Sequence, residues 1–117
     1  MTDSKLRRLS MEFSVEIIEL VKHLRSNRES VISGLIGKCG TGIGAGIHEA
    51  QYTQNRKEYV SRLEDALKDA AETGYWIELL YRTKYIDVQT FKALSGKCIS
   101  LRTLLLATCK TAKETAK

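Results

Sequence analysis

The amino-acid sequence predicts an all-α protein, an antiparallel up-down-up-down four-helix bundle that forms a single domain over residues 1–117. Three observations carry this prediction. The chain contains no proline, the strongest interrupter of helices. Apolar residues recur at spacings of three and four along the long segments, and no comparable segment alternates as a half-buried strand does. The breaks between segments are short, which makes neighbouring helices antiparallel.

The first helix is predicted at roughly residues 4–25 and the second at roughly residues 28–52. Ser26 stands three residues before Glu29, the spacing of a capping box at a helix start. The apolar stripe of the first helix consists of Leu6, Leu9, Phe13, Ile17, Leu20 and Leu24. The stripe of the second consists of Leu35, Cys39, Ile43 and Ile47, with Ile32 and Ile36 beside them.

The third helix is predicted at roughly residues 56–84 and the fourth at roughly residues 88–115. Asn55 precedes Glu58 by three residues in a second capping box, and Asp87 is the predicted N-cap of the fourth helix. The third apolar stripe consists of Tyr59, Leu63, Ala66, Ala70, Thr73, Ile77 and Leu80. The fourth consists of Phe91, Leu94, Cys98, Leu101, Leu105 and Ala112.

Six of the eight glycines lie between Gly34 and Gly46, inside the second predicted helix. One interpretation is a phosphate-binding loop, because "GTGIGA" fits a relaxed dinucleotide fingerprint and "GKC" ends like a Walker motif. The context contradicts both motifs. Ile32 occupies the place of the first Walker glycine and Cys39 the place of its Ser or Thr, and the dinucleotide motif needs a preceding strand where the flanks here are helical.

A helix made thin for close packing explains the glycines better. Each glycine costs about 0.8 to 1 kcal/mol relative to alanine inside a helix, so a favourable contact must offset six of them. Gly40 with Gly44 and Gly42 with Gly46 are small-xxx-small pairs, which let another helix approach closely. That neighbouring helix is expected to belong to this chain or to another subunit.

The composition predicts a cytoplasmic protein without a membrane segment. No run of about 18 apolar residues is present, and the charged start "MTDSKLRRLSMEF" does not resemble a secretory leader. Cys39, Cys98 and Cys109 form no CxxC motif, and an odd number of cysteines does not suit a disulfide framework. A reducing compartment fits this pattern best.

Positive charge is concentrated at the C-terminal end. The chain has a net charge of +5, and residues 88–117 alone carry six Lys or Arg against the single acid Glu114. Five of these bases lie on one side of the fourth predicted helix, away from its apolar stripe: Lys92, Arg102, Lys110, Lys113 and Lys117. The pattern predicts an acidic partner such as RNA or DNA, and a solvated face that keeps the protein soluble is the alternative.

The sequence predicts no catalytic residue, metal, cofactor or small-molecule substrate. A di-iron bundle needs Glu-x-x-His, but His23 follows Leu20 and His48 follows Ala45 at that spacing. Tyr52 stands where a second histidine would complete H-E-x-x-H.

Four further residues are predicted to pack or to form interfaces. Glu49 and Glu72 lie beside apolar stripes, where a buried carboxylate needs hydrogen-bond partners. Tyr75 and Trp76 are either packing and subunit-interface residues or platforms on which bases stack. An enzyme would require His48 to converge with both glutamates.

Two stretches resemble a known family. "GIGAGIHEA", residues 42–50, resembles the S-I-x-A-N-I-x-E-G/A stretch of the small bacterial four-helix-bundle proteins first noted in intervening sequences of 23S rRNA genes. Residues 57–80 and the following "TKYID" resemble the third helix and turn of that family. The similarity runs over nearly the whole chain, although Gly46 replaces the usual Asn and His48 stands where a small residue is common.

The resemblance implies a homo-oligomer, in this family a pentameric ring, with no known catalytic activity. A related branch serves diversity-generating retroelements as accessory proteins, in which a basic ring contacts reverse transcriptase and nucleic acid. The expected function is therefore a scaffold that binds RNA, DNA or a reverse transcriptase. The alternative is a protein–protein interaction module of a two-component system, with incidental positive charge.

Overall fold

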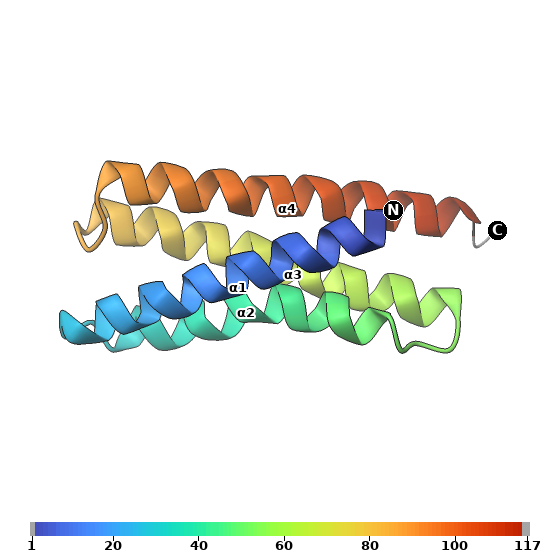
Figure 1. Cartoon of the computed structure of the whole chain (residues 1–117), viewed down its shortest axis with the longest axis horizontal. Coiled ribbons are helices and arrows are strands. Elements are labelled where there is room, and N and C mark those ends of the chain that lie inside the picture. The colour runs from blue at the N-terminus through green and yellow to red at the C-terminus, as the bar shows by residue number, and fades with distance from the viewer. Residues whose placement is uncertain (1, 116–117) are drawn as a thin grey trace.

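The computed structural model describes residues 2–115, with side chains from residue 4 onward. The helices are α1 (Thr2–Ser26), α2 (Val31–Ala50), α3 (Arg56–Arg82) and α4 (Val88–Thr115). Each helix runs antiparallel to the one before it, in a bundle 49 Å long (Figure 1). Within residues 2–115 there is no strand, so the predicted all-α four-helix bundle is confirmed.

The four helices do not contact one another equally. Consecutive helices pack extensively, so that α2 lies between α1 and α3, and α3 lies between α2 and α4. The contact that closes the bundle, between α1 and α4, is much sparser. The connections after α1 and α3 lie at one end of the molecule, and residues 51–55 connect α2 to α3 at the other (Figure 1).

The core consists mainly of the predicted apolar stripes. Leu9, Ile32, Tyr59 and Phe91 are only partly buried and pack against its edge. Leu35 was predicted in the stripe of α2, but this prediction is wrong because its side chain is exposed. The buried face of α2 is centred instead on Ile36, Cys39, Ile43 and Ile47. Since α2 packs against both α1 and α3, its core face points between these two helices and leaves Leu35 outside.

Two predicted helix starts are confirmed. The Asn55 side chain accepts a hydrogen bond from the backbone N–H of Glu58 at 2.9 Å, at the start of α3. At the start of α4, the Asp87 carboxylate accepts one from the backbone N–H of Thr90 at 2.8 Å. This bond holds the pKa of Asp87 below its usual value, because it stabilises the charged form.

The predicted cap at Ser26 is wrong. Ser26 is the last residue of α1, and its hydroxyl donates to the carbonyl of His23 at 2.7 Å. The start of α2 is held instead by Glu29, whose carboxylate accepts from the backbone N–H groups of the first three residues of α2 at 3.2, 3.0 and 2.7 Å. Glu29 is only 7% exposed. A buried carboxylate at a helix N-terminus satisfies free donors and also interacts favourably with the helix dipole.

The turns after α1 and α3 have the same geometry. Arg28 and Lys84 both adopt the left-handed conformation, with φ of 65° and 68°. In the first turn the N–H after Arg28 donates to the carbonyl of Leu24 at 2.9 Å, and in the second the N–H after Lys84 donates to that of Leu80, also at 2.9 Å. This bond is the one that closes a Schellman motif at a helix C-terminus.

Candidate assembly and nucleic-acid interface

Two of the predicted packing glycines lie against α1. A Cβ atom placed on Gly40 would lie 2.9 Å from side-chain carbons of Ile17. One placed on Gly44 would lie 3.1 Å from the hydroxyl of Ser14 and 3.4 Å from the carbonyl oxygen of Ser10. A side chain at Gly40 would therefore clash with α1, and one at Gly44 would be tight against it, so both glycines favour the close approach of α1 and α2.

The other pair lies against α3. A Cβ on Gly42 would lie 2.6 Å from a carboxylate oxygen of Asp69, and one on Gly46 would lie 3.4 Å from the Cβ of Ala66. Burial raises the pKa of Asp69, and Glu72 adds to this effect by charge repulsion. The glycine segment is helical throughout and packs within its own chain on two sides, which excludes an open phosphate-binding loop.

The structure does not bring the predicted glutamates together. Glu49 and Glu72 are both exposed, so neither is buried within the chain, and an interface role for them stays a prediction. Glu72 accepts a hydrogen bond from the Trp76 indole N–H at 2.9 Å. Glu72 is next in sequence to Thr73, whose hydroxyl contacts Cys39 of α2. Cys39 stands ten residues before Glu49, which corresponds to about 15 Å along α2. His48 is therefore also far from Glu72, and the three side chains form no common site.

Tyr75 and Trp76 lie side by side on α3. Their rings meet edge to face with centroids 5.0 Å apart. Trp76 is partly buried and packs against the core, whereas Tyr75 is exposed. Trp76 therefore contributes to packing within the chain, and an interface role for Tyr75 stays a prediction.

The predicted basic residues of α4 fall into two groups. Lys92, Arg102 and Lys110 are exposed, and none of them takes part in an ion pair between described residues. Lys113 instead pairs with Glu64 of α3 at 2.9 Å, which raises the pKa of the lysine. Lys117 lies outside the described residues. The charge available on the surface of α4 is therefore carried by the first group.

A groove between α1 and α4, which the sequence did not predict, follows their sparse contact. Its wider part has a volume of about 930 Å³, and a hollow of about 440 Å³ continues from it, with Glu16 and Ala93 lining both. Glu16 pairs with Lys97 at 2.6 Å, joining α1 to α4. The apolar side chains that line the wider part include Leu9, Phe13 and Leu101.

Comparison with known proteins identifies the family of this chain. The family model for 23S rRNA-intervening sequence proteins matches residues 2–107. The chain belongs to this family. A solved structure from Bacteroides thetaiotaomicron, of a protein of unknown function from the S23 ribosomal protein family, is 39% identical and superimposes with a TM-score of 0.92. That alignment covers 94% of this chain and 99% of the other, and no curated protein matches the sequence.

The described part of this 23S rRNA-intervening sequence family member contains neither a metal-ligand cluster nor a membrane-spanning helix. Among the described side chains, no group of three His, Cys, Asp or Glu is close enough to hold a metal ion. None of the helices within residues 2–115 is long and apolar enough to cross a membrane.

The cysteines of this family member are part of its core. All three are buried and unpaired with one another. Burial raises the pKa of the Cys98 thiol to about 11 and raises the pKa values of Cys39 and Cys109 above the usual range. The hydroxyl of Thr73 donates to the Cys39 sulfur at 3.2 Å. These thiols fill space between helices.

The folded protein is expected to resist alkylation at all three cysteines. At about pH 8, raised pKa values leave few thiolates, and burial blocks the reagent. Treatment with iodoacetamide followed by intact-mass measurement should give no adduct on the native protein. The same treatment in denaturant should add three. Rapid labelling of native Cys98 would contradict its place in the core.

Proposed function

We propose that the protein is a non-catalytic oligomeric scaffold that presents the basic surface of α4 to nucleic acid or to a nucleic-acid enzyme such as a reverse transcriptase. The observation that carries this proposal is the exposed group of Lys92, Arg102 and Lys110. None of these three side chains forms an ion pair with an acidic residue in the described part of the chain. Bases that are not neutralised within the chain remain available to phosphates.

A ring would strengthen this weak surface. Three bases on one small subunit bind phosphates poorly, but several copies held together engage one strand at several points and raise the overall affinity. The number of subunits, five, follows from the resemblance to the family. Assembly is therefore part of the proposed function, and binding by the isolated subunit is expected to be weak.

Reversing the three charges tests the nucleic-acid surface. The triple variant Lys92→Glu, Arg102→Glu and Lys110→Glu should lose at least about tenfold in affinity for single-stranded RNA at about 50 mM salt, because phosphate contacts dominate such binding. Fluorescence anisotropy measures this loss. The wild type should also bind less tightly as salt is added.

A matched control variant separates the contribution of this surface from the contribution of net charge. Lys38→Glu, Lys57→Glu and Lys68→Glu change the net charge equally on exposed residues of α2 and α3. This control should retain most of the affinity. Equal losses in both triple variants would reduce the effect to non-specific attraction, and a wild type that binds neither RNA nor DNA at low salt would contradict the nucleic-acid function.

The second candidate is a protein-interaction module. The exposed Tyr75 ring beside Trp76 favours it, because tyrosine and tryptophan are enriched at protein interfaces. In that case affinity purification should return a protein partner free of nucleic acid, and Tyr75→Ala should abolish its recovery.

A further inference from the structure

We propose that the groove between α1 and α4 receives the outer face of α1 from a second copy of this chain. This inference rests on the proposed function, since it names the surface through which the scaffold assembles. Its two halves are present on the same chain: an exposed apolar stripe on α1 and an apolar groove that continues into an acidic hollow.

The stripe consists of Met11, Val15 and Ile18, which are 66%, 52% and 44% exposed. Their spacing of four and then three residues places them on one side of α1, which at about 100° per residue points away from the buried stripe that contains Phe13 and Ile17. A row of large apolar side chains at this spacing is how a helix docks into a groove.

The groove has room for such side chains. Its floor is formed by Phe13 and Leu101, which are almost fully buried. Its α4 wall is made of the small residues Ala93, Gly96 and Ser100. A Cβ atom on Gly96 would have no heavy atom within 4 Å, so the wall leaves space for incoming side chains.

Charge favours the docking of α1 in particular. In the wide part of the groove, Glu12 and Glu16 are balanced by Lys5 and Lys97. Its continuation is acidic, because it is lined by Glu16, Glu19 and Asp87 and by no Lys or Arg. Along the stripe, by contrast, bases stand before and after the apolar residues: Arg7, Arg8, Lys22 and Arg25. A basic, apolar helix face therefore complements an apolar groove whose continuation is acidic.

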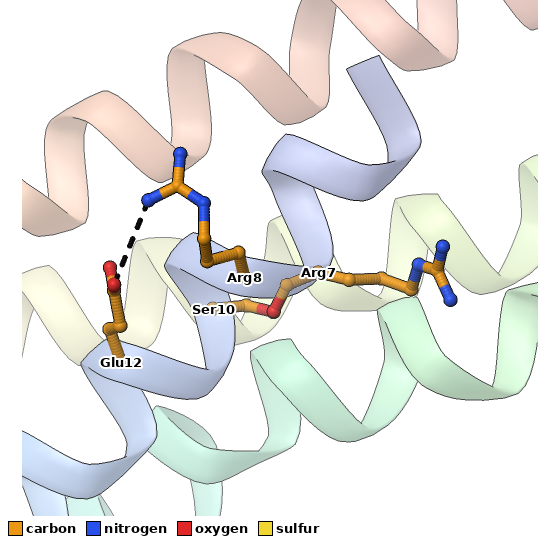
Figure 2. A network of polar contacts seen from close by, with 4 residues as sticks. All are labelled: Arg7, Arg8, Ser10 and Glu12. Carbon is orange, nitrogen blue, oxygen red and sulfur yellow. Dashed lines mark hydrogen bonds and ion pairs between the residues drawn. The ribbon is translucent and has the colours of Figure 1, made fainter. Parts of the chain in front are cut away.

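The existing contact of Arg8 does not oppose this arrangement. Figure 2 shows Arg7 and Arg8 projecting to different sides of α1, with Arg8 paired to Glu12. That pair is 3.7 Å long and both side chains are more than half exposed, so it contributes little and can be exchanged for a contact between subunits.

The stripe and the groove are different surfaces, although Val15 belongs to the stripe and also lines the groove. Contact between two different surfaces is heterologous, and its repetition gives a ring where the rotation closes and an open filament where it does not. In the proposed ring, every subunit gives its stripe to one neighbour and its groove to the other.

Two variants test the two halves. Met11→Glu with Ile18→Glu places charge on the stripe and should weaken self-association at least about tenfold, because apolar anchors dominate such interfaces. Gly96→Leu fills the groove from its α4 wall and should weaken association by a similar factor. Light scattering coupled to size-exclusion chromatography measures both, and circular dichroism checks that both fold. Gly96→Leu should melt no lower than the wild type, since leucine favours helix and its Cβ atom would meet no neighbour.

Ile99→Glu is the matched control. Ile99 is 56% exposed at mid-helix on α4 and does not line the groove, so this variant should assemble as the wild type does. If the wild type assembles and both test variants still assemble, the inferred interface is wrong while the scaffold proposal stands. If Ile99→Glu alone disrupts the assembly, the interface lies on the outer face of α4. A wild type that is monomeric at about 100 μM would overturn assembly itself and this interface with it.

Discussion

Gly44→Leu is expected to lower the free energy of unfolding by about 3 kcal/mol, the upper range for overpacking a close contact. Even a Cβ atom at this position lies 3.1 Å from the Ser14 hydroxyl and 3.4 Å from the backbone carbonyl oxygen of Ser10. The remaining leucine carbons need further space next to α1, and a backbone atom cannot rotate away. The gain in helix propensity, about 0.8 kcal/mol, offsets only part of this cost.

Gly34→Leu is the control for this prediction. Gly34 lies in the same helix, but a Cβ atom there has no heavy atom within 4 Å. The substitution should leave stability unchanged or raise it by up to about 0.8 kcal/mol, through helix propensity alone. Urea unfolding followed by circular dichroism measures both variants. Equal midpoints for the two would show that α1 and α2 do not depend on close approach at Gly44.

Glu29→Ala is expected to cost about 2 to 3 kcal/mol, more than an average helix cap. The carboxylate accepts from the first three backbone N–H groups of α2, and it is almost completely buried. Alanine would leave these donors without an acceptor in a place that water reaches poorly. It would also remove a negative charge from the positive end of the helix dipole.

Two serines on either side serve as controls. Ser30 is the N-cap residue of α2 by position, yet its side chain makes no capping hydrogen bond. Ser26 is exposed and bonds only within α1. Alanine at either position should cost less than about 0.5 kcal/mol in thermal or urea unfolding. A larger loss at Ser30 than at Glu29 would contradict the assignment of the cap.

The fold could be predicted because its cause is local. Spacings of three and four residues, the absence of proline and the Asn55 and Asp87 caps each depend on residues close together in the sequence. The error at Ser26 has a local cause too. Ser26 and Glu29 match a capping box, but the α1 turn continues to Arg28 in the left-handed conformation, which moves the start of α2 to Val31.

The surfaces could be predicted only in part. The spacing of Gly40 and Gly44 indicates close approach, but only the packing identifies α1 as their neighbour. The partner of Lys113 is Glu64 on another helix, so the charge of the C-terminal segment alone does not reveal that Lys113 is neutralised. The stripe at Met11 was not predicted, although the spacing of its residues is present in the sequence. The groove could not be predicted, because it depends on how unequally the helices contact one another.

The matching turns at Arg28 and Lys84 have a consequence for the speed of folding. Each turn is closed by a hydrogen bond between residues five apart, so each helical hairpin can form from its own neighbourhood before the two halves meet. Chains dominated by such short-range contacts cross a low entropic barrier and reach the native state within microseconds to milliseconds. We therefore expect each chain to complete its bundle before the proposed assembly begins.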